Sequence, residues 1–141
     1  MLFMKLVSIE TKADYLKLLD FLEEKTKYVE VLRLLDDTES HFIIEKYRSR
    51  LVTEKKVSHW LDSGGKGTLF KFDFDLKSRR PFFADLRRSE PFFYNRVANF
   101  LGESFATTTF GYVNIAFFDL QGKLLFYTIT HEGLAWLEEY L

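Results

Sequence analysis

Residues 109–130, TFGYVNIAFFDLQGKLLFYTIT, decide the fold class of this chain. The opening part, TFGYVNIAFF, is apolar at successive positions, as in a strand buried on both faces, and the closing part, KLLFYTIT, has a similar composition. Between them, DLQG places Asp119 at the first and Gly122 at the fourth position of a turn. The stretch therefore predicts a C-terminal β-hairpin.

The rest of the chain predicts strands and helices in mixed order. Apolar and β-branched residues, alternating or in short runs, predict strands at residues 3–9, 27–35, 41–47 and 68–75. Helical spacing, caps and prolines predict helices at 11–24, from Thr53 to 61, in two consecutive segments of 79–101 broken near Ser89, and after Thr130. This order predicts an α+β fold. Its sheet is mixed or mainly antiparallel and covered by helices, and a terminal helix follows the hairpin.

Length and composition predict one domain over residues 1–141 with an aromatic-rich core. The chain has 141 residues, a common size for a single domain. Hydrophobic residues make up 47% and aromatic residues 18% of the chain, with 16 Phe. Each fully buried Phe contributes about 1.5–3 kcal/mol. We therefore expect the core to be stable without crosslinks or metal.

The absence of cysteine excludes disulfides, thiolate metal sites, iron–sulfur clusters and a cysteine nucleophile. The first ten residues, MLFMKLVSIE, lack the basic start of a signal peptide, and Lys5 interrupts their apolar run. No segment approaches the ~20 apolar residues that span a bilayer. We expect a cytoplasmic protein with no membrane contact.

Motifs for catalysis, cofactors and metals are missing from the sequence. The GGKGT loop has the wrong spacing for a phosphate-binding loop, and HEGLA lacks the second histidine of the zinc motif HExxH. Neither the serine elbow G-x-S-x-G nor the dinucleotide motif G-x-G-x-x-G occurs. We therefore predict no catalytic residue, no metal and no cofactor, and we lean against an enzyme.

One acidic pair needs separate mention. Asp73 and Asp75 are expected on the same face of a strand, where two carboxylates could hold a cation or share acid–base chemistry. Alternation with Lys71 explains them more simply as part of a solvated face.

Charge is distributed unevenly along the chain. Residues 1–45, 46–96 and 97–141 carry net charges of −4, +7 and −4. This distribution could produce a surface that steers an anionic partner, or the opposite charges could neutralise one another in the fold. We favour neutralisation.

The segment 77–96, KSRRPFFADLRRSEPFFYNR, is the main candidate binding region. It carries six basic side chains interleaved with aromatic ones and has a net charge of +4. Guanidinium groups suit phosphates and carboxylates, so the predicted binding residues include Arg79, Arg80, Arg87, Arg88 and Arg96. The structural interpretation, which we favour for this segment, is that the phenylalanines anchor the core and the arginines form a solvated rim that can pair with the acidic thirds of the chain.

Trp60 is a second candidate contact residue. It lies beside the glycine-rich loop, and tryptophan often anchors interfaces. A tryptophan that ends an amphipathic helix more often lies in the core, and we favour that position for Trp60.

Three functions remain as hypotheses. The first is a non-catalytic interaction protein that binds an acidic macromolecular partner through residues 77–96. The second is a small hydrolase or transferase, which a pairing of His59 or His131 with Asp73 or Asp75 would support. The third is a nucleic-acid-binding protein, which the pI of about 6.3 disfavours. Surplus apolar surface could also be buried in a homodimer.

Overall fold

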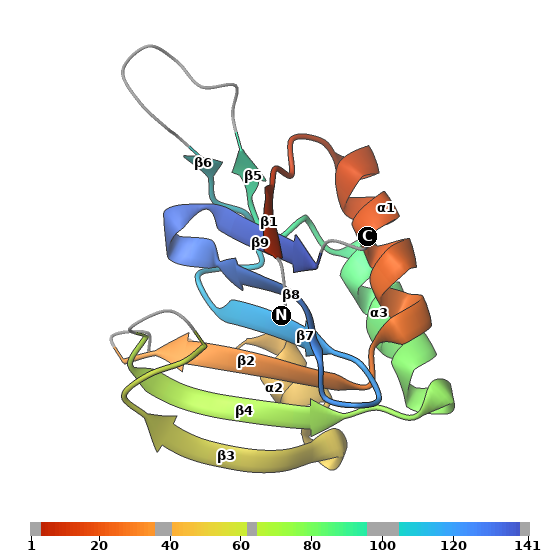
Figure 1. Cartoon of the computed structure of the whole chain (residues 1–141), viewed down its shortest axis with the longest axis vertical. Coiled ribbons are helices and arrows are strands. Elements are labelled where there is room, and N and C mark those ends of the chain that lie inside the picture. The colour runs from red at the N-terminus through yellow and green to blue at the C-terminus, as the bar shows by residue number, and fades with distance from the viewer. Residues whose placement is uncertain (1–3, 36–40, 62–64, 96–104, 139–141) are drawn as a thin grey trace.

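Seven strands form one antiparallel sheet, which is the main feature of the fold (Figure 1). The computed structural model describes residues 4–35, 41–61, 65–95 and 105–138. Across the sheet the strands are, in spatial order, β1 (Met4–Val7), β9 (Leu134–Glu138), β8 (Leu124–Ile129), β7 (Asn114–Phe118), β2 (Tyr28–Leu34), β4 (Gly67–Asp73) and β3 (Leu51–Val57). Strands β5 (Tyr94–Asn95) and β6 (Phe105–Ala106) form a separate short pair.

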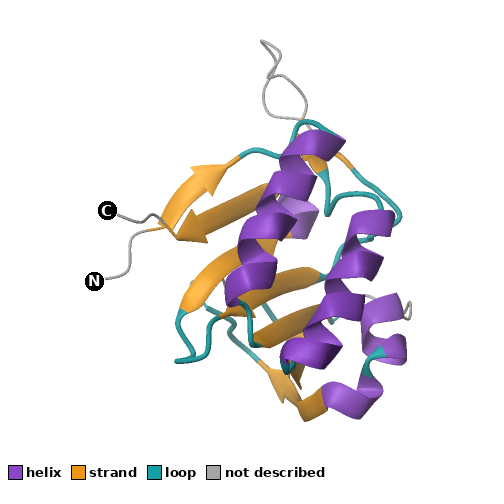
Figure 2. Ribbon diagram, turned by 90° about the vertical axis from the view of Figure 1, so that its right-hand side faces the viewer, coloured by secondary structure: helices purple, strands orange, loops and turns teal. Residues whose placement is uncertain are grey.

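In the described part of the chain, three helices lie on one face of the large sheet (Figure 2). They are α1 (Lys12–Lys25), α2 (Phe42–Lys46) and α3 (Leu76–Arg88). Between helices and sheet lies an aromatic core of fully buried rings, among them Tyr15, Phe70, Phe72, Phe74, Phe82, Phe83, Phe92, Phe117 and Phe126. An α+β fold with an antiparallel sheet and an aromatic-rich core is therefore confirmed.

Helix α1 begins where the sequence predicts. The Thr11 hydroxyl accepts a hydrogen bond from the Asp14 N–H at 3.1 Å, and the Asp14 carboxylate accepts one from the Thr11 N–H at 3.1 Å. This capping box satisfies N–H groups that the first turn leaves without helical partners.

The second of the two helices predicted over 79–101 is wrong in its described part, because Tyr94–Asn95 form strand β5; residues 96–101 lie outside the described residues. The first predicted helix is present as α3, which ends at Ser89, where the break is predicted. It begins after Asp75, whose carboxylate accepts from the Ser78 N–H at 2.7 Å, and it passes through Pro81. Proline removes one helical N–H, but Pro81 lies on the exposed side. Burial of Phe82, Phe83 and Leu86 on the other side outweighs that loss.

Two further segments exchange helix and strand relative to the prediction. Residues 42–46 form helix α2, whose N-terminus is capped by His41. The adjacent Ile43 and Ile44 are both buried. Successive residues of a strand point to opposite faces, so a strand with one buried face could not bury both. The helix predicted from Thr53 to 61 is instead strand β3 and the connection that follows it.

The terminal helix predicted after Thr130 is also wrong. A 3-10 turn at Thr130–Glu132 ends at Gly133, which has a left-handed φ of 66°, and strand β9 follows. Strand β9 inserts between β1 and β8, with Trp136 opposite both Leu6 and Tyr127. The apolar residues at 134–137 therefore pack on both faces of an inner strand of the sheet, and they do not form the apolar face of a helix.

The face of the sheet opposite the helices carries a second, smaller apolar cluster. Its buried members are Leu32, Trp60, Leu69, Ala116, Tyr127 and Ile129. Strand register places Ala116 between Ile115 and Phe117 of the main core, so its side chain points away from the helices. We call the face of the sheet that carries this cluster the helix-free face.

None of the helices in the described ranges is long and apolar enough to cross a bilayer.

Candidate functional site

Helix α3 distributes the predicted arginines over two sides. Positions 77, 80, 84 and 88 fall on one side of a helix with 3.6 residues per turn. Lys77, Arg80 and Arg88 on that side are exposed, whereas Arg79 and Arg87 are partly buried. The segment therefore has an outward basic side and a side that contacts the rest of the protein.

Arg87 joins α3 to α1. Its Nη1 lies 2.5 Å from Glu23 Oε1 and its Nη2 lies 2.9 Å from Asp20 Oδ1. Desolvation alone would lower the pKa of Arg87, but the hydrogen bonds and charges of Glu23 and Asp20 outweigh it and raise that pKa. This guanidinium is neutralised inside the fold.

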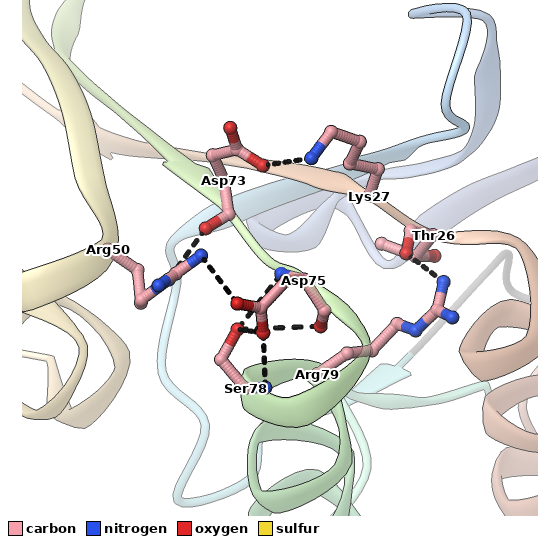
Figure 3. Close-up of polar contacts among 7 residues, drawn as sticks. All are labelled: Thr26, Lys27, Arg50, Asp73, Asp75, Ser78 and Arg79. Atoms are coloured by element: carbon pink, nitrogen blue, oxygen red, sulfur yellow. Dashed lines mark hydrogen bonds and ion pairs between the residues drawn. The ribbon is translucent and has the colours of Figure 1, made fainter.

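Arg79 supports the connection between α1 and β2. Its Nη1 donates to the backbone carbonyl of Thr26, the residue that ends α1 (Figure 3). The carbonyls of a helix's last turn lack helical partners, and a cation there is favourable. Arg79 therefore stabilises the end of α1.

Arg88 belongs to a cluster around Asp85. The buried Asp85 carboxylate contacts Arg88 Nη2, accepts from the Tyr47 hydroxyl, and lies 2.7 Å from Lys46 Nζ. The side chains of Lys46 and Arg88 remain 57% and 69% exposed, against 10% for Asp85. The two cations can thus reach solvent while the carboxylate between them is covered.

The pKa of Asp85 is set by opposing effects. Desolvation by burial raises the pKa of this carboxyl. The hydrogen bonds from Lys46 and Tyr47, together with the charges of Lys46 and Arg88, outweigh burial and hold the pKa below its ordinary value. Asp85 is therefore ionised at neutral pH.

Lys77 and Arg80 are the remaining cations of α3. Both are exposed, and within the described part of the chain neither forms a salt bridge. Lys46, Lys77, Arg80 and Arg88 together form what we call the α3 basic strip. At 1.5 Å per residue it extends over roughly 16 Å from position 77 to 88.

A groove of about 900 Å³ runs between α1 and α3. It is lined on one side by Asp20, Glu23 and Glu24, and on the other by cations that include Arg80 and Arg87. The expected neutralisation of opposite charges therefore occurs here for Arg87, which pairs with carboxylates of the acidic N-terminal third. Arg80 forms no salt bridge with any described residue.

Asp73 and Asp75 do not share a strand face, contrary to the prediction. Asp73 ends β4 and lies 2.7 Å from Lys27 Nζ, whereas Asp75 caps α3 (Figure 3). Hydrogen bonds from the backbone and side chain of Ser78 hold the pKa of Asp75 below its ordinary value. Arg50 connects the two through the Asp73 carbonyl at 2.8 Å and the Asp75 carboxylate at 3.7 Å.

The histidines lie apart from these aspartates. His41 is buried, its Nδ1 accepts from the Ile43 N–H at 3.3 Å, and its Nε2 donates to the Phe110 carbonyl at 2.6 Å. His59 and His131 are exposed, and the acidic neighbour of His131 is Glu132 at 3.9 Å. Among the described residues, no three His, Asp or Glu side chains are grouped to hold a metal ion. The pairing that would support an enzyme is not seen there.

Trp60 takes part in the packing of the helix-free face. Its side chain is buried, its indole Nε1 donates to Glu30 Oε1 at 3.0 Å, and its ring meets Tyr127 edge-on at 6.2 Å. Contact with a partner would require this residue to leave its present position. Arg96 lies outside the described residues.

Sequence reasoning missed Lys46 as a member of the basic strip. The signal available was weak, because Lys46 is far from residues 77–96 in sequence and joins them only through Asp85. Asp85 itself was visible as the single acid within RRPFFADLRR.

Comparisons of the chain with models of known families, with curated proteins and with solved structures found no match. The functional proposal below therefore rests on the geometry and charge of the described residues.

Proposed function

We propose that this protein is a non-catalytic interaction protein that binds an acidic macromolecular partner through the α3 basic strip. One observation carries the proposal. The strip presents four exposed cations, whereas the single carboxylate among them, Asp85, is buried beneath Lys46 and Arg88. Among the described residues, no acid forms a salt bridge with Lys77 or Arg80.

The distribution of contacts narrows the binding surface. Arg79 and Arg87 contact α1 and its C-terminal end, whereas Lys77 and Arg80 form no salt bridge with the residues that the structure describes. Free cations on a solvent-facing helix raise the association rate with an acidic surface, and this effect weakens as salt increases.

The burial of the aromatic side chains favours an acidic protein over nucleic acid. Single-stranded nucleic acids are bound by exposed aromatic rings on which the bases stack. Phe82, Phe83, Phe92 and Phe93 are all fully buried and cannot offer such a platform. The strip therefore offers positive charge but none of these four rings for bases to stack on. Such a surface suits a cluster of carboxylates on a protein partner.

The test compares two double charge reversals. Lys77→Glu/Arg80→Glu removes the unpaired cations of the strip, and Lys55→Glu/Lys56→Glu makes the same change in net charge on exposed positions of β3. Binding to poly-glutamate is measured by fluorescence anisotropy over a range of salt concentrations. We expect the strip variant to bind at least tenfold more weakly, about 1.4 kcal/mol, and to depend less on salt.

Equal losses in the two variants would mean that poly-glutamate responds only to net charge, and the strip would be rejected. A short single-stranded RNA forms a second arm of the experiment. Tighter binding of that RNA than of poly-glutamate at the same salt concentration would replace the acidic-protein proposal with the nucleic-acid one.

A further inference from the structure

Helices α1 and α3 lie side by side and run in opposite directions (Figure 1). Arg79 of α3 donates to the carbonyl of Thr26, which ends α1. At the other end, Lys12 Nζ at the start of α1 donates to the carbonyl of Ser89, which ends α3, at 2.5 Å. The groove of about 900 Å³ between the two helices, which we call the α1–α3 groove, has acids on its α1 wall and cations on its α3 wall.

Only part of the charge in this groove is neutralised inside the fold. Two of the three acids of the α1 wall pair with Arg87. The third, Glu24, is exposed and forms no salt bridge with any residue that the structure describes. Glu24 therefore faces solvent on one wall of the groove, whereas the exposed Lys77 and Arg80 lie on the other.

A molecule that binds in the α1–α3 groove meets both signs of charge. An occupant with acids on every side is attracted by Lys77 and Arg80 but repelled by Glu24, and like charges brought together disfavour a wrong partner. An occupant with acids toward α3 and a cation toward α1 has a favourable contact on each wall. The groove therefore selects a partner by the arrangement of its charges as well as by their sum.

A helix of the partner supplies this arrangement. Glutamates at i, i+4, i+7 and i+11 fall on one side of a helix and extend over roughly 16 Å, which is the length of the α3 basic strip from position 77 to 88. The residue that follows each glutamate points about 100° away from it around the helix axis. A helix laid along α3 thus places one row of side chains on the strip and the next row toward α1.

We propose that the acidic partner docks a helix along the α1–α3 groove, with a row of acids on the α3 basic strip and an adjacent row of cations toward Glu24. This inference rests on the proposed function, because it names the part of the partner that occupies the strip. Glu24 is then a specificity residue, since it rejects a helix that is acidic on every side.

Two alanine-based helical peptides serve as probes. Both carry four glutamates with the i, i+4, i+7, i+11 spacing. In the mixed peptide a lysine follows each of them, and in the all-acid peptide a second glutamate does. Fluorescence anisotropy measures their affinities for the full chain at about 0.15 M salt, where the Debye length is about 8 Å. We expect the mixed peptide to bind about threefold more tightly, the effect of an exposed ion pair, although the all-acid peptide carries more negative charge.

Replacing Glu24 should reverse this preference. In Glu24→Lys we expect the ratio of mixed to all-acid affinity to fall about tenfold, because one contact becomes repulsive and the other attractive. The variant should fold, since Glu24 is exposed in the last turn of α1, where the helix dipole favours a cation. Glu10→Lys is the matched control. It makes the same charge change at an exposed position that precedes α1, roughly 20 Å away along the helix, and should leave the ratio unchanged.

A ratio that Glu24→Lys leaves unchanged, or that Glu10→Lys lowers equally, would overturn the inference. So would a wild-type protein that binds the all-acid peptide more tightly or does not bind the mixed one. The variant Lys77→Glu/Arg80→Glu separates the two proposals. If it weakens both peptides while the ratio does not respond to Glu24→Lys, the strip binds acidic partners without this selection. If it weakens neither peptide, the proposed function fails, and the inference with it.

Discussion

Asp85 is in contact with three side chains of the candidate site, those of Lys46, Tyr47 and Arg88. Its carboxylate holds Lys46 and Tyr47 near one helix and Arg88 on another, although it is itself nearly covered. A buried hydrogen-bonded carboxylate is costly to disturb, because its partners lose a charged acceptor that water does not replace. Asp85 therefore fixes the position of half the α3 basic strip.

Replacing Asp85 should reveal this role. We expect Asp85→Asn to lower the free energy of unfolding at neutral pH by about 1–3 kcal/mol, because the buried Tyr47 hydroxyl loses its charged acceptor. Urea denaturation followed by circular dichroism measures the change. Asp20→Asn is the control, since this largely exposed carboxylate pairs with Arg87 at the surface and should contribute less than about 1 kcal/mol.

The contribution of Asp85 should depend on pH in one direction. Its pKa in the folded state lies below the ordinary value, so the ionised carboxylate stabilises the fold above the unfolded-state pKa of about 3.9. This stabilisation is lost as the pH falls through the folded-state pKa. The stability difference between wild type and Asp85→Asn should be constant near neutral pH and shrink in acid. A difference that grows below about pH 4 would contradict this assignment.

Elements are where sequence and structure diverge most. The alternation of Phe70, Phe72 and Phe74 with polar residues correctly predicts β4 and its buried face, because period two is unambiguous. Residues 42–46 and 134–138 are short apolar runs that suit a helix or a strand equally, and tertiary contacts decide between them. For that reason the sequence wrongly predicts a strand at the first run and a helix at the second.

Strand pairing also imposes a requirement on Gly67. A Cβ at this position would lie 2.0 Å from the Arg33 carbonyl oxygen of the neighbouring strand, far inside van der Waals contact. We expect Gly67→Ala to force β2 and β4 apart locally and to destabilise the protein by about 1–3 kcal/mol.

Chemical denaturation measures this effect. Thr68→Ala, at the next position of β4, adds no atoms and should cost less than about 1 kcal/mol. If Gly67→Ala proves as stable as wild type, the close approach of these two strands is wrong.

At the scale of the molecule, the burial of a side chain on its own helix can be predicted from the sequence, whereas its partners on other elements cannot. Local spacing correctly predicted that Phe82 and Phe83 anchor the core, because their place on the helix follows from the sequence. The partners of Arg87 lie 64 and 67 residues away, at Glu23 and Asp20, and only the packing of α1 on α3 brings them together. Which arginines stay free could not be read from the sequence because long-range packing decides it.

The sheet should unfold as one unit. Tyr127 contacts both tryptophans of the chain, Trp60 at 6.2 Å and Trp136 at 4.8 Å between ring centres. In Trp60→Phe and in Trp136→Phe the remaining tryptophan reports on a different part of the sheet. We expect fluorescence and circular dichroism to give the same urea midpoint within each variant. An earlier fluorescence transition for Trp136 would mean that the β1–β9 edge unfolds separately.

Pairing of β1 with β9 joins strands that leave the ribosome at very different times (Figure 1). About 130 residues separate them, and at roughly 5–20 residues per second synthesis of that length takes on the order of ten seconds. Throughout this interval β1 has no neighbour in the growing polypeptide. The β1–β9 pair can therefore form only after the last of its strands has been synthesised.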